Sequence, residues 1–257
     1  MASFGGVEFD TGKMIIRLLS KKLQKAKLIV HEAQKACSVS LVELQRITGF
    51  LNFASIVIPL GRTFLRRLYN MQLYFTQGKR QMRRRLSAEA QKDLVLWAKV
   101  LLLAPERSNQ VQKWDIVSLW SDAAGIKELG AFYTRGTDQY SGPEPDSAFS
   151  ISLPSYIARA REHINTKEMR VVEQALLYWS RRWKGLKVII HVDNRAVAQG
   201  LENQTIRGAP MTILRRCLLL AAEHDLDLEA RWIPTKENAL ADALSWFDYD
   251  RIDNLAS

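Results

Sequence analysis

Acidic side chains at the ends of two predicted strands have the surroundings that metal-dependent chemistry requires. Asp193 closes the run Lys187 to Asn194, whose apolar positions predict a buried central strand with an acid at its carboxyl end. Asp122 follows a second run of this kind, at 116–120. Because an ionised carboxylate is costly to bury, an acid at such a place needs a metal ion or a hydrogen-bond partner.

Two further acids fall on predicted helices. Glu168 continues the apolar stripe of a helix expected at 166–183, which directs its carboxylate toward the sheet. Asp242 lies inside a short apolar helix expected at 237–246. An acid within an apolar segment is more difficult to explain by solvation than an acid in a loop.

Taken one at a time, each of these acids is explained by an ordinary structural role at least as well as by a catalytic role. Asp122 can form a turn, and Asp193 can cap the helix that begins at Asn194. Glu168, third in a helix capped by Asn165, can satisfy a backbone amide. Only the combination of the acids favours a metal site.

The elements that would position the acids form an α/β domain. The pattern predicts strands at 116–120, 129–134 and 148–153, and then helices alternating with strands at 187–192 and 228–233. Three strands followed by such an alternation describe a mixed sheet with helices packed on it. We place a domain boundary in the polar stretch 108–113, which gives domains at 1–110 and 111–257.

The first domain is basic and mainly helical. The whole chain carries 37 Lys and Arg against 27 Asp and Glu, and residues 1–110 hold 19 of these bases but only 7 of the acids. A hairpin is expected at 6–19 and helices at 21–35, 41–53, 62–74 and 88–103, and Ser40 and Glu43 form a capping box that opens the second of these helices. A basic surface beside an acidic site suits an enzyme that acts on a polyanion. The alternative is that the positive charge only maintains solubility.

The densest basic run is Lys79 to Arg85. A phosphate-contacting arm, a nuclear localisation signal and a solvated loop explain it equally well. No apolar run reaches the length of a membrane span, and the amino terminus lacks the pattern of a secretory signal. We therefore expect an intracellular protein, in the nucleus or the cytoplasm, with no membrane partner.

The segments that carry the acids resemble the RNase H domain of retrotransposon polyproteins. In order, they are Ser121–Ala123, Asn165–Arg170, His191–Val197 and Trp232–Ser245. The Asp-Asn pair at 193–194 points to the tyrosine-recombinase (DIRS-like) elements rather than to the Ty3/gypsy group. The resemblance covers residues 114–247 and implies an RNase H-like mixed five-stranded sheet flanked by helices.

The resemblance implies a metal-dependent endonuclease that cleaves the RNA strand of RNA/DNA hybrids. The residues to which it assigns catalysis and metal binding are Asp122, Glu168, Asp193 and Asp242. They would hold two Mg²⁺ ions, with Mn²⁺ as an alternative, and Asp122 would bridge both. Asn194 and Asn238 would contact the substrate or orient the site.

The basic domain resembles the last palm hairpin, the thumb and the connection region of a reverse transcriptase. Most of the palm and the fingers are absent, and there is no Tyr-x-Asp-Asp motif, so we expect no polymerase activity in this chain. A polymerase palm and fingers region, or another protein chain, is a further expected partner. The basic residues expected to bind the hybrid are Arg62, Arg66, Arg80, Arg83 and Arg84.

A rival hypothesis is a domesticated, noncatalytic module that binds nucleic acid or protein. Many cellular RNases H carry a histidine in the loop before the last helix, whereas the loop at 234–237 has none. Retention of all the acids favours the nuclease, because without metal they would raise one another's pKa and reduce stability.

Overall fold

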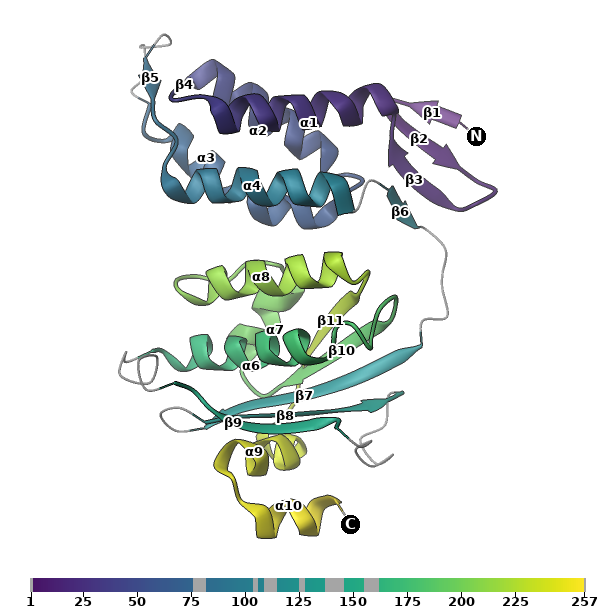
Figure 1. Cartoon of the computed structure of the whole chain (residues 1–257), viewed down its shortest axis with the longest axis vertical. Helices are drawn as coiled ribbons and strands as arrows, with labels where there is room; N and C mark the ends of the chain where they lie inside the picture. Colours follow the sequence, from purple (N-terminus) through teal and green to yellow (C-terminus); the bar gives the residue numbers. More distant parts are fainter. Residues whose placement is uncertain are drawn as a thin grey trace. The chain divides into compact units, whose positions relative to one another are not determined.

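The computed structural model describes residues 2–75, 82–103, 106–108, 115–124, 128–136, 146–154 and 162–256. The chain divides into two compact units, unit 1 at 1–112 and unit 2 at 113–257 (Figure 1). Among the described residues, none of the helices combines the length and the apolar character that a membrane span needs.

Unit 1 contains a small antiparallel sheet. Its strands, in spatial order, are β1 (Ala2–Phe4), β2 (Val7–Asp10), β3 (Ile15–Leu18) and β6 (Glu106–Ser108). The predicted hairpin is formed by β2 and β3, and its turn is held by Asp10, whose carboxylate accepts hydrogen bonds from the amides of Gly12 and Lys13 at 3.0 Å each. The sheet therefore joins the two ends of unit 1, because β6 pairs with β3 from about 90 residues away along the chain.

Helices make up the remainder of unit 1. They are α1 (Ser20–Lys35), α2 (Leu41–Ala54), the 3-10 helix η1 (Pro59–Phe64), α3 (Arg66–Gln72) and α4 (Ala88–Leu103), and the short strands β4 (Val39–Ser40) and β5 (Arg83–Arg84) pair with each other. The expected capping box starts α2, with reciprocal hydrogen bonds between Ser40 and Glu43. The single helix expected at 62–74 is only partly correct, because an α-helix forms at 66–72 alone. The chain forms η1 and then α3, and the proline at the start of η1 occupies a first-turn position that needs no amide donor.

Unit 2 is built on a five-stranded mixed sheet. Its strands, in spatial order, are β11 (Asp227–Trp232), β10 (Lys187–Val192), β7 (Ile116–Ala124), β8 (Glu128–Arg135) and β9 (Ala148–Ser152). The first three run parallel to one another, and β8 and β9 continue the sheet in antiparallel fashion. The prediction of a mixed five-stranded sheet with flanking helices is confirmed.

The helices of unit 2 cover both faces of this sheet (Figure 1). One face carries α6 (Ile164–Trp179), α7 (Arg195–Glu202) and α8 (Pro210–Glu223), while α9 (Ala239–Trp246) packs on the other face against β7 and β8. The helix α10 (Tyr249–Ala256), which we did not predict, packs on α9. Under α9 lies a core cluster of Trp120, Phe132, Ala241 and Leu244, to which Ile252 of α10 adds its side chain.

The parallel pairing determines where the strand acids meet. The last pair between β7 and β10 joins Trp120 to His191. Asp122 and Asp193 each lie two residues beyond this pair, so their side chains leave the sheet at the same edge and on the same face. The register therefore brings the acids of two distant sequence segments together.

Candidate active site

Three acids from three elements converge at the carboxyl edge of the parallel strands. One carboxylate oxygen from each of Asp122, Glu168 and Asp193 lies within 4.8 Å of the other two. The sheet supplies the first and the last of these acids, and the first turns of α6 supply Glu168. This is the cluster expected from the sequence, apart from Asp242.

Glu168 is the most deeply placed acid, with 3% of its surface exposed. Its Oε2 atom is buried and has no hydrogen-bond partner among the described residues. Burial, and to a smaller extent the charges of Asp122 and Asp193, raises the pKa of Glu168 to about 9. The simple explanation, that Glu168 satisfies a backbone amide in the first helical turn, is not what the structure shows. The helix is instead capped by His163, whose side chain accepts a hydrogen bond from the amide of Asn165.

Asp122 lies under the last turn of α9 and is 7% exposed. Its Oδ2 atom accepts a hydrogen bond of 2.5 Å from the hydroxyl of Ser245. Burial raises the pKa of Asp122 to about 6; the hydrogen bond from Ser245 opposes this shift, and the charges of Asp193 and Asp242 add to it. The donor lies on α9, 123 positions further along the chain, and nothing in the local sequence pattern identified it.

Asp193 is held by the last residue of β11 and by the segment that follows this strand. Thr235 donates a hydrogen bond of 2.8 Å from its hydroxyl to Oδ2 of Asp193, and the indole N–H of Trp232 donates one of 2.8 Å to the backbone carbonyl of Asp193. The Trp232 ring is in turn covered by the guanidinium of Arg195, 4.2 Å from its centroid. Thr235 is the first residue of the 3-10 helix η3 (Thr235–Asn238), which directly precedes α9.

Asp242, the fourth expected acid, is not part of the cluster of three. Its Oδ2 atom accepts a hydrogen bond of 2.6 Å from Nη1 of Arg251 on α10. It is near enough to Asp122 to raise the pKa of that carboxyl. In this structure the fourth carboxylate is therefore next to the cluster but is neutralised by a cation of the chain itself.

The two asparagines expected at the site are both engaged within the protein. Asn194 caps α7 through its side-chain oxygen and donates from Nδ2 to Oδ1 of Asn165, 2.9 Å away. The capping role considered for Asp193 thus belongs to Asn194, which leaves the Asp193 carboxylate for the cluster. Asn238 is completely buried and donates a hydrogen bond of 3.0 Å to the carbonyl of Ser121. That position suits orientation of the segment next to Asp122 and gives no surface for substrate.

His191 is packed in the core and takes no place among the acids. Its ring stacks on that of Trp120 with centroids 4.7 Å apart, and burial lowers the pKa of His191 to about 4. His191 is therefore a packed side chain of the core.

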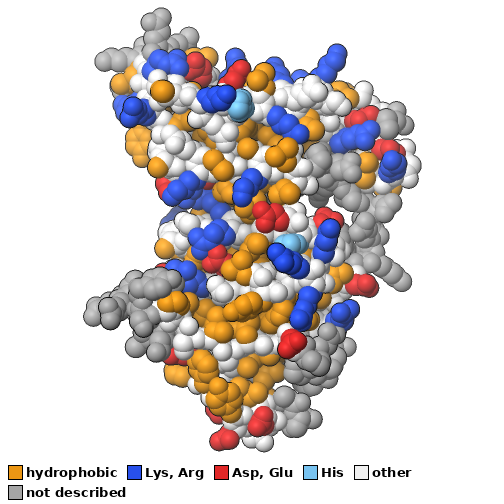
Figure 2. Space-filling model, viewed as in Figure 1, with side chains coloured by type: hydrophobic (Ala, Val, Ile, Leu, Met, Phe, Trp, Pro, Cys, Tyr) orange, Lys and Arg blue, Asp and Glu red, His pale blue; other side chains and the backbone are white. Residues whose placement is uncertain are grey.

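The basic residues expected to bind the hybrid have different surroundings in unit 1. Arg62 on η1 and Arg66 on α3 are exposed, whereas Arg80 lies outside the described residues. Arg83 is engaged: it donates to the carbonyl of Ser38 at 2.7 Å and forms an ion pair with Glu43 at 3.0 Å. Arg84 lies over the ring of Phe75, 6.0 Å from its centroid, with Nε buried. Figure 2 shows Lys and Arg side chains over the helices of unit 1, with acidic ones among them.

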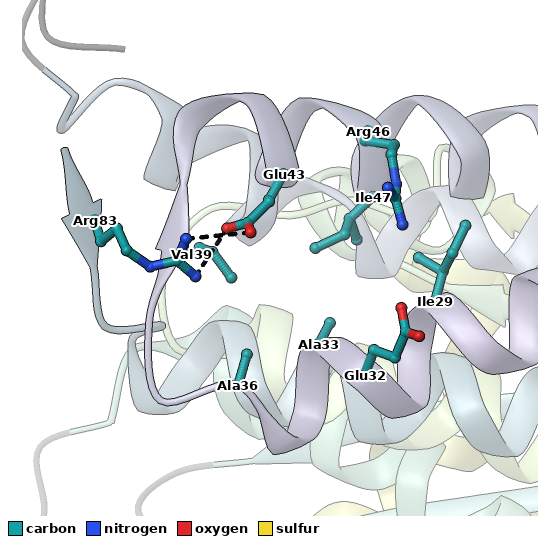
Figure 3. Close-up of a pocket in the computed structure, with 9 residues that line it drawn as sticks. All are labelled: Ile29, Glu32, Ala33, Ala36, Val39, Glu43, Arg46, Ile47 and Arg83. Atoms are coloured by element: carbon teal, nitrogen blue, oxygen red, sulfur yellow. Dashed lines mark hydrogen bonds and ion pairs between the residues drawn. The ribbon is translucent and has the colours of Figure 1, made fainter. Parts of the chain in front are cut away.

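A pocket of about 150 Å³ lies within unit 1, between α1 and α2. Its floor is apolar, and the Arg83–Glu43 ion pair closes one end (Figure 3). Glu32 and Arg46 extend toward its mouth from the two helices (Figure 3). Its lining lacks the acids of unit 2, so this pocket is separate from the cluster of Asp122, Glu168 and Asp193.

Comparison with known proteins gives structural likenesses only. No family model matches the chain, and no curated protein matches it. The N-terminal RNase H domain of a Mycobacterium tuberculosis protein is similar to 51% of the chain at 16% identity and a TM-score of 0.39, over 97% of that domain's chain. A metagenomic RNase H1 from compost, solved with an RNA/DNA hybrid, is similar to 55% of the chain at 17% identity and a TM-score of 0.37, over 99% of its own length.

A foamy viral protease-reverse transcriptase, also solved with an RNA/DNA hybrid, is similar over 90% of the chain at 15% identity and a TM-score of 0.33. The present chain spans 29% of that viral chain. Since all identities are below 20% and all TM-scores below 0.5, the function has to be argued from the residues of the chain itself.

The acidic cluster has the donor set of a divalent metal site. Its oxygen ligands are those that Mg²⁺ and Mn²⁺ prefer, and the unpartnered Oε2 of Glu168 faces no protein donor among the described residues. A cation would compensate for the burial and, to a smaller extent, the mutual repulsion that raise the pKa of Glu168 and of Asp122. The residues present therefore fit a divalent ion.

Proposed function

We propose that the chain is a metal-dependent endonuclease that cleaves the RNA strand of RNA/DNA hybrids, an RNase H of a DIRS-like retrotransposon, without polymerase activity of its own. The observation that carries the proposal is the convergence of Asp122, Glu168 and Asp193, from three separate elements, within 4.8 Å of one another. A chain that needed these acids only for turns and caps would have no reason to bring them together, because their proximity costs stability.

The roles of the protein groups follow from their positions. Asp122, Glu168 and Asp193 would hold the first Mg²⁺ or Mn²⁺ ion, and Asp242 would join them at a second one after release from Arg251. When bound, such ions supply Lewis-acid stabilisation of charge on a phosphodiester and activation of water. Thr235 fixes the carboxylate of Asp193 by its hydrogen bond.

The hybrid is the substrate that fits both units best. Unit 1 carries 19 of the 37 basic residues of the chain and 7 of the 27 acids, so it suits the phosphate backbone of a duplex. The RNA strand would be distinguished from DNA by its 2′-hydroxyls. We propose that residues 1–110 serve as a thumb and connection region and that Arg62, Arg66, Arg80 and Arg84 contribute to backbone binding. Arg83 is bound internally and belongs to this set only if its ion pair opens.

The test is cleavage of an end-labelled RNA/DNA hybrid with Mg²⁺ or Mn²⁺, beside single-stranded RNA and double-stranded RNA. Asp193→Asn should reduce hybrid cleavage by at least about 100-fold, because it removes a carboxylate from the cluster. Asp225→Asn is the matched control, since Asp225 is exposed in a left-handed turn that asparagine also tolerates. Tight hybrid binding without cleavage in either metal would instead establish the noncatalytic binding module.

A further inference from the structure

The last turn of α9 lies unusually close to the sheet. Gly130 of β8 is the cross-strand partner of Asp122. A Cβ atom at Gly130 would be 2.3 Å from the backbone nitrogen of Ser245 and 2.7 Å from the carbonyl oxygen of Ala241. Since real Cβ contacts of this length do not occur, only glycine lets the helix backbone approach the strand next to Asp122.

A second strand fixes the same turn of the helix. The hydroxyl of Ser150, on the edge strand β9, donates a hydrogen bond to the carbonyl of Leu244. The end of α9 is therefore held at two neighbouring points, by direct backbone packing on β8 and by a side chain of β9. Ser245 follows Leu244, and its position over Asp122 is a consequence of both contacts.

Ser245 is completely buried, and two oxygens lie within reach of its hydroxyl. One is Oδ2 of Asp122 at 2.5 Å, and the other is the backbone carbonyl of Asp242 at 2.8 Å. A serine hydroxyl has a single proton, so it can donate to only one of them at a time. An ionised carboxylate is the stronger acceptor, and a donor there fixes the rotation of the carboxylate group.

We propose that Ser245 is a positioning residue of the metal site, which orients the carboxylate of Asp122 and ties it to the helix that carries Asp242. The proposal rests on the function proposed above. Ser245 would touch neither the metal nor the substrate. It would act only through Asp122, in the way that hydrogen-bonding partners of metal ligands generally do.

A purely structural role is the alternative, because a buried serine can also donate to a carbonyl of its own helix. Ser150 provides the matched control. It too is a serine that donates to α9, but its acceptor is a backbone carbonyl, and within the described part of the chain its side chain forms no hydrogen bond with the acids. Ser150→Ala removes a hydroxyl from the same helix–sheet contact and leaves the Ser245–Asp122 hydrogen bond in place.

The experiment is a calorimetric titration of the full chain with Mn²⁺ alone, for the wild type, Ser245→Ala, Ser245→Cys and Ser150→Ala. Ser245→Cys keeps a side chain in the site but replaces the hydroxyl by a weak donor. Thermal unfolding identifies variants that have lost their fold. If Ser245→Ala is unfolded, the comparison rests on Ser245→Cys. We expect the two Ser245 variants to bind Mn²⁺ about 10- to 100-fold more weakly than the wild type, which is the range found when hydrogen-bonding partners of metal ligands are removed. Their affinity for the hybrid should be roughly unchanged. Ser150→Ala should stay within about twofold of the wild type.

The inference is overturned if both Ser245 variants bind Mn²⁺ as the wild type does, or if Ser150→Ala weakens binding equally. Failure of the proposed function gives a different result, because the wild type itself would then neither bind Mn²⁺ at the cluster nor cleave the hybrid. In that case Ser245 has no metal site to organise, and the inference fails with it.

Discussion

At the scale of single residues, the site brings mutually repelling carboxylates together with a few neutral hydrogen-bond donors. Glu168 has no protein donor for its buried Oε2 among the described residues, while Asp122 and Asp193 have one hydroxyl each, from Ser245 and Thr235. Burial, and to a smaller extent the repulsion between the acids, therefore favours proton binding in the metal-free protein, mainly at Glu168, whose pKa is raised to about 9. A cation and a proton compete for the same carboxylate.

This competition makes stability depend on pH in a direction that can be measured. The folded-state pKa of Glu168 is about 9 against an ordinary value of 4.5, so its contribution to stability is greatest below pH 4.5 and is lost as the pH rises toward 9. Glu168→Gln cannot ionise and should avoid this loss. We expect the metal-free variant to be more stable than the wild type at pH 7, by up to about 3 kcal/mol, with no difference near pH 4.5.

Urea unfolding in the presence of a chelator, at several values between pH 4.5 and 8, measures this difference. Glu223→Gln, at an exposed position, serves as the control and should change stability by less than about 0.5 kcal/mol. A stability difference between Glu168→Gln and the wild type that does not grow with pH would contradict the placement of Glu168 in a buried acidic cluster.

At the scale of elements, two helices decide how the fourth acid is used. The helix α9 is held on β8 and carries Asp242, and α10 folds back on α9 and brings Arg251 to it. Ile252 of α10 packs against the core cluster under α9, so the placement of Arg251 does not depend on the ion pair alone. A cation from the chain thus competes with any metal for Asp242.

Removal of that cation should strengthen metal binding. Arg251→Gln frees the carboxylate of Asp242, and since partly exposed ion pairs contribute about 0.2 to 1 kcal/mol, we expect Mn²⁺ to bind more tightly by a factor of roughly 1.4 to 5. Arg251→Lys keeps the charge and is the control. Titration without nucleic acid isolates the effect from any contact that Arg251 makes with substrate. An unchanged or weaker affinity in Arg251→Gln would show that Asp242 takes no part in metal binding.

At the scale of the whole molecule, charge is divided between two compact units. The acids of the candidate site lie in unit 2, and residues 1–110 hold 19 bases against 7 acids. This division suits a protein in which one unit binds the duplex backbone and the other performs the chemistry. Counterion release from the duplex then provides much of the affinity.

The salt dependence of hybrid binding tests this division. Arg62 and Arg66 are exposed on η1 and α3, and their joint replacement by glutamine should weaken binding at low salt. The slope of log K against log salt should fall by about 0.9 for each phosphate contact that is lost, hence by nearly 2. Fluorescence anisotropy between 50 and 300 mM salt, values chosen on the order of the physiological range, gives the slope. An unchanged slope would show that these arginines face away from the nucleic acid.

Much of the fold could be predicted because it depends on local periodicity. Alternating and continuous apolar runs located the five strands of unit 2, and the Ser40–Glu43 capping box located the start of α2. The same patterns placed Asp122 and Asp193 at strand ends and Glu168 on the buried face of a helix. These features are determined by residues a few positions apart, and the sequence displays such relations directly.

Only the tertiary structure decided what each acid touches. The partner of Asp122 is 123 positions away, at Ser245, and that of Asp193 is 42 positions away, at Thr235. The cap expected from Asn165 is supplied by His163 instead, because α6 begins at Ile164, and the side chain of Asn165 accepts a hydrogen bond from Asn194, 29 positions away. By itself the sequence determined which elements form and which face each acid occupies. Packing determined which donors reach the acids, since contacts between distant segments depend on how whole helices and strands fit together and not on the residues next to them.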